Sequence, residues 1–292
     1  MSGPLPSSGP LSLLNIQEEF LGSNPIGLSE YYRGGALVPN SSSTTTIPTS
    51  GTIAVSNFYG TRRRIAIPIT ISSPTFNYDL FTNRSPSYVA GISDMTFTVN
   101  GGVRVGSTSV DAYAMSVPSS FNAGDTINVV NNGYIQGMGG TGGPSILGAS
   151  PGPAGFKGGN AMYANRPVTV QNNGVLASGG GGGGAGGGGQ DDKGPARRGA
   201  GGGGGAGYNV GPGGAGPSGG SNGTADAGGG GGSGDAAPGG AGGGRGAAGN
   251  NGVNSGGANP RSGGAGGATG YYITGNSYVT WSATGTRQGS VA

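Results

Sequence analysis

Hydrophobic residues alternate with other residues in two stretches, 65–71 and 95–99, which is the pattern of a half-buried β-strand. Pro68 within the first stretch indicates a strand at the edge of a sheet. An Asn-Gly-Gly sequence at 100–102 separates the second stretch from Val103-Arg104-Val105, as in a hairpin. These patterns predict a small antiparallel β domain over residues 63–126.

Residues 1–62 carry shorter patterns in which apolar and aromatic residues precede a glycine. Segments 26–34 and 53–60 are related, and 11–16 is a weaker third copy. Ser12 can cap a short helix running to about Phe20, and Gly22 can end it in the left-handed conformation. Helices this short are marginal alone. We expect a docking module with exposed aromatic anchors; a self-contained cap on the next domain is the alternative. The predicted anchors are Tyr31, Tyr32, Phe58 and Tyr59.

A repeat of strand, tight turn and second strand follows. Residues 127–137 match residues 168–177 around a shared Asn-Asn-Gly, and residues 278–289 form a degenerate third copy. The first two copies lead directly into glycine-rich sequence. The repeat therefore predicts a β platform from which glycine segments leave and to which the chain returns.

The composition excludes several classes of function. The 292 residues include 74 glycines, with no cysteine and no histidine, and only 9% of them are charged. Disulfides, Cys/His zinc sites and catalysis by an imidazole or a thiol are excluded. Residues 62–64 form the one arginine cluster, so nucleic-acid binding is not expected. We also expect no enzyme activity, cofactor, metal site or membrane insertion, and assembly in a cytoplasm.

The glycine runs between residues 178 and 270 allow several structures. Collagen needs glycine at every third position with side chains between, and a flexible linker does not need regular punctuation by turn sequences. The favoured interpretation is a bundle of polyglycine II helices, with three residues per turn and every backbone group pointing outward. Such rods can pair laterally on all sides where no Cβ intervenes. The predicted fold is thus mostly β plus non-regular, with this bundle on the β platform.

The Asn-Gly strand repeats that feed glycine runs, together with the closing segment 271–281, resemble the tail-fibre-tip adhesins of T-even-like bacteriophages. The resemblance covers residues 127–292. Residues 1–62 resemble a module found in many tailed-phage structural proteins, typified by segments 24–35 and 47–60. The resemblance implies a virion protein with three parts: an attachment module (1–62), a β domain (63–126) and a polyglycine II domain (127–292).

The same resemblance implies a receptor-binding tip that recognises a host surface protein or glycan through its turns, with another phage structural protein bound at residues 1–62. The alternative is a structural fibre, collar or head-decoration protein whose glycine bundle only stiffens it. Copy number and oligomeric state stay open. The predicted receptor contacts are Asp191, Asp192, Lys193, Arg197, Arg198, Tyr208 and Asn209, with Asp226, Asp235, Arg245 and Arg261 as further candidates.

Overall fold

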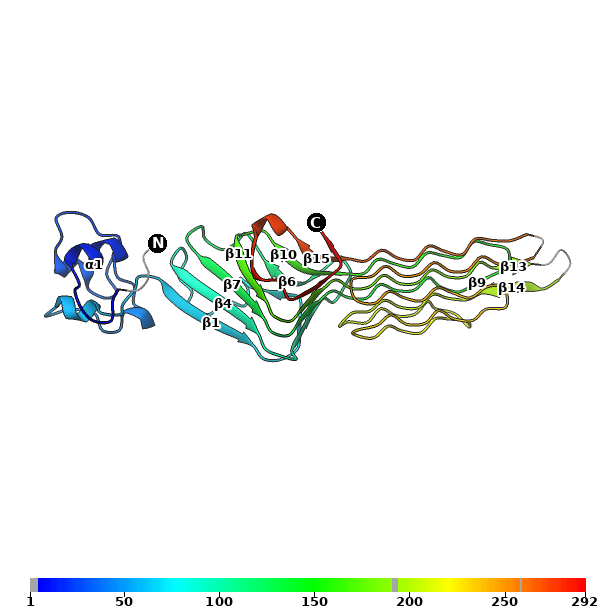
Figure 1. Ribbon diagram of the computed structural model, residues 1–292, viewed down its shortest axis with the longest axis horizontal. Helices are drawn as coiled ribbons and strands as arrows, with labels where there is room; N and C mark the ends of the chain where they lie inside the picture. The colour runs from blue at the N-terminus through cyan, green and yellow to red at the C-terminus, as the bar shows by residue number, and fades with distance from the viewer. Residues whose placement is uncertain (1–4, 191–193, 258) are drawn as a thin grey trace. The chain divides into compact units, whose positions relative to one another are not determined.

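The computed structural model describes residues 5–190, 194–257 and 259–292. The described chain is mostly β with little helix (Figure 1). It forms two compact units. Unit 1 is Met1–Ile69 with Arg84–Thr96 and Phe121–Ile127, and unit 2 is Thr70–Asn83 with Phe97–Ser120 and Asn128–Ala292. The division into domains at residues 62/63 and 126/127 stays a prediction.

The N-terminal part of unit 1 contains the expected short helices. Helix α1 (Leu13–Phe20) begins after Ser12, whose hydroxyl accepts the Asn15 N–H at 3.1 Å, so this cap is confirmed. The left-handed residue that ends α1 is Leu21 rather than Gly22. Gly22 is required for another reason: a Cβ there would lie 1.9 Å from the Tyr31 hydroxyl. Three short 3-10 helices follow, η1 (Leu28–Tyr31), η2 (Ser42–Thr44) and η3 (Val55–Phe58).

These helices enclose a hydrophobic core of their own. The rings of Phe20, Tyr31 and Phe58 meet edge to face, with centroids 6.0–6.3 Å apart. Tyr31 and Phe58 are completely buried, so the expectation that both are exposed anchors is wrong. The aromatic residues recur along this part of the sequence because they form its core, where each ring shields the other two from water. Tyr32 and Tyr59 are half-buried at its surface.

Most strands belong to three five-stranded sheets. The first sheet contains β1 (Ile65–Ile71), β4 (Ser93–Val99), β7 (Thr126–Asn131), β11 (Val168–Asn172) and β16 (Val279–Ala283). The second contains β2 (Thr75–Phe76), β5 (Arg104–Gly106), β8 (Tyr134–Gln136), β12 (Val175–Ala177) and β17 (Thr286–Gln288). The third contains β3 (Tyr78–Asp79), β6 (Tyr113–Val117), β10 (Asn160–Ala164), β15 (Tyr271–Thr274) and β18 (Ser290–Val291). A 3-10 helix, η4 (Asn276–Tyr278), precedes β16.

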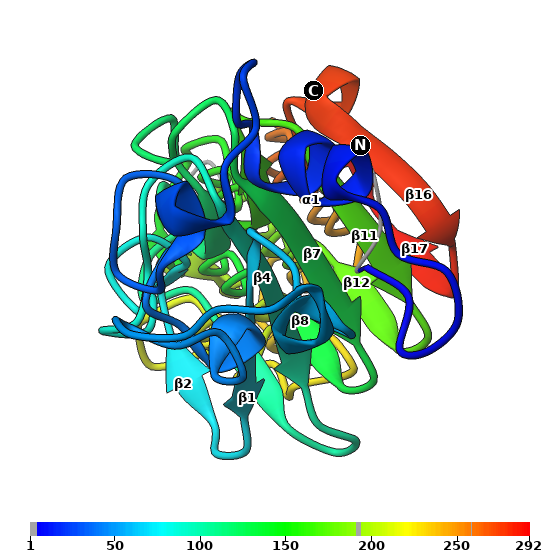
Figure 2. The same cartoon turned by 90° about the vertical axis from the view of Figure 1, so that its left-hand side faces the viewer.

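The chain visits the three sheets in rotation, so together they form a three-sided parallel solenoid. Strand β11, for example, lies between β7 and β16 and pairs parallel with both (Figure 2). The expected antiparallel domain over 63–126 is therefore wrong. Residues 100–102 make no hairpin, because β4 and β5 lie in different sheets. Side chains alternate between buried and exposed in parallel and antiparallel strands alike. The hydrophobic alternation in the sequence therefore could not distinguish parallel from antiparallel pairing.

The Asn-Gly repeats form one corner of the solenoid, and the predicted strand–turn–strand units are confirmed. The Asn131 side-chain amide donates to the Asn172 side-chain oxygen at 2.8 Å, and Asn172 donates to the Thr284 carbonyl at 2.9 Å. Both asparagines are 1% exposed. The third repeat replaces the asparagine by a backbone carbonyl, which explains why its sequence is degenerate.

The glycine-rich sequence of unit 2 forms extended rods that run side by side (Figure 1). Every N–H from 179 to 188 donates to a carbonyl of a neighbouring rod, at 2.7–3.0 Å. The acceptor changes with a period of three. Residues 179, 182, 185 and 188 donate to rod 150–159, residues 180, 183 and 186 to rod 200–206, and residues 181, 184 and 187 to rod 247–253.

Three further rods donate back to the same central rod. Gly140 and Gly143 donate to the carbonyls of residues 180 and 183. Rod 240–243 donates to the carbonyls of residues 181 and 184, and rod 264–270 to those of residues 179, 182 and 185. The central rod thus has six neighbours, three accepting from it and three donating to it. We call this arrangement the glycine lattice. Its hydrogen bonds satisfy the backbone groups that glycine runs would otherwise leave buried without partners.

Arg64, in the arginine cluster, is used inside unit 1. Its Nε donates to Asp94 at 2.7 Å, and its two Nη groups donate to the Gly124 carbonyl at 2.8 Å and the Thr126 hydroxyl at 2.9 Å. The guanidinium therefore joins the starts of β4 and β7, which accounts for an arginine at this position without an external phosphate.

Candidate functional site

Turns at the two ends of the glycine lattice carry most of its polar side chains. The rods leave and re-enter the solenoid at one end, which we call the near end. Strands β9 (Ile146–Leu147), β13 (Gly189–Gln190) and β14 (Ala196–Gly199) lie at the other, the far end (Figure 1). Successive rods run in opposite directions, so the turns alternate between the ends. The near-end turns are 207–211, 224–228 and 245–247. The described parts of the far-end turns are 145–151, 189–190 with 194–199, 215–219, 232–238, and 254–257 with 259–262.

Tyr208 and Asn209 lie at the near end. The Tyr208 ring stacks on Phe76 with centroids 5.0 Å apart and the planes 14° from parallel. The Asn209 side-chain amide donates to the Thr108 carbonyl at 3.2 Å. Both side chains therefore pack against the solenoid, and the structure does not place them with the other predicted receptor contacts.

Asp226 and Arg245 also lie at the near end, where they join the lattice to the solenoid. Asp226 pairs with Arg104 at 3.3 Å and with Arg245 at 3.4 Å. The Arg104 guanidinium lies 4.0 Å above the Tyr134 ring, and the Gln136 side-chain amide donates to the Ala225 carbonyl. These further candidates therefore have a structural role in holding the lattice on β5 and β8.

The far end contains a small antiparallel sheet. Strand β14 (Ala196–Gly199) lies between β13 (Gly189–Gln190) and β9 (Ile146–Leu147) and pairs antiparallel with both. The Arg198 carbonyl accepts the Ala236 N–H at 3.0 Å. Three segments that are distant in sequence, 145–151, 194–199 and 232–238, are thereby held together, and residues 189–190 pair with the second of them.

The side chains at the far end are mixed in chemistry. Arg197, Asp235 and Arg261 are exposed, and Arg198 is half-buried. Leu147 is 54% exposed, a signal that sequence reasoning missed. Asp191, Asp192 and Lys193 lie outside the described residues. In the turn 254–262, the Arg261 N–H donates to the Ser255 hydroxyl at 2.8 Å, which fixes the backbone that presents Arg261.

The described part of the chain contains no group of three or more Asp, Glu, His or Cys side chains arranged to hold a metal ion. No described helix is long and apolar enough to span a bilayer.

Residues 66–292 match the sequence model of a family described as phage tail fibre adhesin Gp38. The chain belongs to this family. It is therefore a phage tail-fibre adhesin, a receptor-binding component of the virion. The resemblance drawn from the glycine repeats is confirmed, and the family match begins at residue 66, upstream of the repeats.

One solved structure extends the comparison. The chain is similar to a chain in the crystal structure of the gp37–gp38 adhesin tip complex of the bacteriophage S16 long tail fibre. The two are 24% identical with a TM-score of 0.57, and the match covers 84% of this chain and 88% of the other. This likeness shows a shared fold. No curated protein matches the chain.

Proposed function

We propose that this adhesin binds a host surface protein or glycan through its far-end turns and is held on the tail fibre by residues 5–61. The observation that carries the proposal is the separation of the turns into two groups. The near-end turns are occupied by contacts to the solenoid, whereas the far-end turns present Leu147, Arg197 and Arg261 to solvent.

We infer that the rods are polyglycine II helices. The period of three in the lateral hydrogen bonds supports this, since that helix has three residues per turn and no internal hydrogen bonds. A lattice of glycine offers few side chains for recognition. Specificity therefore resides in the turns, which can vary in sequence while the rods stay fixed.

Attachment through residues 5–61 is supported by the apolar surface of α1. Leu13, Leu14 and Leu21 are 38%, 54% and 66% exposed. The half-buried rings of Tyr32 and Tyr59 are the predicted anchors that remain at the surface, and their hydroxyls donate to the carbonyls of Gly51 and Gly9. In the phage S16 structure a gp38 adhesin forms a complex with gp37. By analogy, the partner of this chain is a tail-fibre protein.

The family assignment favours adhesion over a purely stiffening role. We propose no enzymatic activity, in keeping with a family of adhesins. The receptor class can be determined by treating host cells before adsorption is measured. Protease treatment removes a protein receptor, and periodate oxidation destroys a glycan receptor.

The experiment that tests the site compares phage carrying Leu147→Asp at the far end with phage carrying Ala227→Asp, an exposed near-end residue. Both variants introduce the same charge on the lattice. The expected result is at least a tenfold lower adsorption rate for Leu147→Asp, because an unpaired carboxylate is desolvated in the receptor contact. Ala227→Asp stays within twofold of the parent. Equal adsorption by both phages, with equal adhesin content, contradicts the site.

A further inference from the structure

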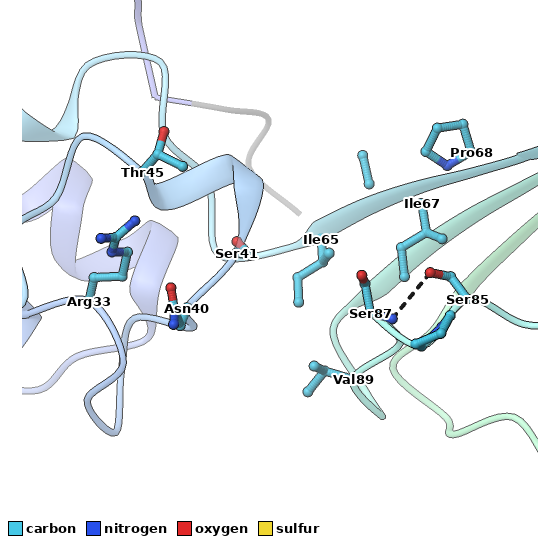
Figure 3. A pocket seen from close by; sticks show the side chains of 12 residues that line it. Arg33, Asn40, Ser41, Thr45, Ile65, Ile67, Pro68, Ser85, Ser87 and Val89 are labelled. Atoms are coloured by element: carbon cyan, nitrogen blue, oxygen red, sulfur yellow. Dashed lines mark hydrogen bonds between the residues drawn. The ribbon is translucent and has the colours of Figure 1, made fainter.

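Unit 1 contains an open cleft of about 620 Å³. Its walls come from three stretches, 33–45, 65–68 and 85–89, and Figure 3 shows their side chains around the opening. Val89, Pro68 and Pro86 contribute apolar surface over the buried Ile65 and Ile67, and serine, threonine and asparagine side chains contribute hydroxyl and amide groups. A cleft of this size and mixture is within the range of specific binding sites.

One wall of the cleft is a free sheet edge. Strand β1 is the outermost strand of its sheet. The Ile65 N–H donates to the Ile92 carbonyl at 2.8 Å, on the inner side. Because alternate residues of a strand face opposite neighbours, the N–H and C=O of Ala66 and the C=O of Pro68 face outward. These groups can pair with one more extended segment.

The lining of the cleft also includes Arg33, a cationic side chain with an unused hydrogen-bond donor. The Nε of Arg33 is buried and has no hydrogen-bond partner. None of the lining residues that the structure describes is acidic. An arginine N–H without a partner in a partly desolvated site is costly, and a carboxylate is its best acceptor.

We infer that this cleft binds an extended segment of the tail-fibre partner, which adds to the edge of β1 and places a carboxylate on Arg33. The inference rests on the proposed attachment through residues 5–61 and names the chemistry of the segment that is bound. Pro68 has no N–H, so the added pairing is short and centres on Ala66. Because the pairing is short and needs a carboxylate on the partner, it limits non-specific pairing of other strands with the edge of β1 while the tail-fibre segment is bound.

The test measures the affinity of the full-length adhesin for the tail-fibre protein of the same phage, by titration calorimetry. Arg33→Gln removes the cation and Ser87→Trp fills the cleft; Arg63→Gln and Ser72→Trp are matched changes outside it. The expected result is at least a tenfold rise in Kd for each cleft variant, with both controls within twofold. Arg33→Lys is expected to recover part of the loss. Thermal melting selects variants that retain the parent's fold.

Parent-like affinity for either folded cleft variant overturns the inference. A variant lacking residues 5–61 separates this result from failure of the attachment proposal. If that deletion abolishes binding while the cleft variants bind normally, attachment stands and the cleft is not its site. If the deletion leaves binding unchanged, both proposals fail.

Discussion

The N–H of Gly183 donates to the carbonyl oxygen of Gly203 across 2.7 Å, between two rods in the interior of the glycine lattice. Around Gly183 the packing leaves no room for a side chain. A Cβ on this residue would lie 2.0 Å from the Gly240 carbonyl oxygen, and that contact is with backbone, which cannot rotate away. Rod spacing, and hence every lateral hydrogen bond nearby, depends on the missing Cβ.

Gly183→Val is therefore expected to lower the free energy of unfolding by at least about 3 kcal/mol, the range of severe overpacking. Gly230→Ala is the matched control, because its nearest neighbour, the Ser221 hydroxyl, would lie 3.5 Å from the new Cβ, an ordinary contact. This control is expected to change stability by less than about 1 kcal/mol. Denaturant titration measures both, and a Gly183→Val protein as stable as the parent refutes the lattice.

The lattice could be predicted from sequence because consecutive glycines leave few structures in which buried backbone groups are all paired. The corner repeat was also recognisable, since Asn131 and Asn172 occupy equivalent positions before a turn glycine. The parallel solenoid could not be predicted, because hydrophobic alternation in 65–71 and 95–99 marks which side chains are buried and not the direction of the partner strand. Direction here follows from corners that change sheet instead of reversing the chain.

Two groups of candidate residues show a different limit. Tyr31 and Phe58 carry the same aromatic signal as Tyr32 and Tyr59, yet the first pair forms a core. Burial depends on how the short helices fold back on one another. For the turns, sequence order did contain usable information: successive rods run in opposite directions, so counting turns separates Tyr208 from Arg198.

The buried asparagine ladder makes a second prediction. Asn172 both accepts from Asn131 and donates to the Thr284 carbonyl, with 1% of its surface exposed. Asn172→Leu removes the side-chain acceptor of the buried Asn131 amide and the donor to the Thr284 carbonyl, so we expect a loss of about 1–3 kcal/mol in the free energy of unfolding. Asn173→Leu, at the exposed neighbouring position, is expected to cost less than about 1 kcal/mol. Equal melting temperatures for the two variants would show that the ladder adds no stability.

Stability at high pH is expected to depend on Tyr88. Burial, and then its hydrogen bond to the Asp125 carboxylate at 2.6 Å, raises the pKa of Tyr88 above the usual value of 10.0. The folded state therefore holds this proton more tightly than the unfolded state. The resulting stabilisation is complete below about pH 10 and is lost as the pH rises through the folded pKa.

Tyr88→Phe removes this titration. We expect the free energy of unfolding to fall less steeply above pH 10 in the variant than in the parent, with parallel curves at pH 6–8. Urea titrations at each pH provide the comparison. If the free energy of unfolding of the variant falls as steeply above pH 10 as that of the parent, the effect belongs to other tyrosines.

The central claim, that the far-end turns touch the host receptor, is tested most directly by photo-crosslinking on living cells. A benzophenone amino acid replaces Leu147 at the far end in one phage and Ala227 at the near end in another, since both positions are exposed. After adsorption and irradiation, adhesin-linked host molecules are separated on gels and identified. A host adduct is expected from position 147 and none from position 227. An adduct from position 227 alone would contradict it.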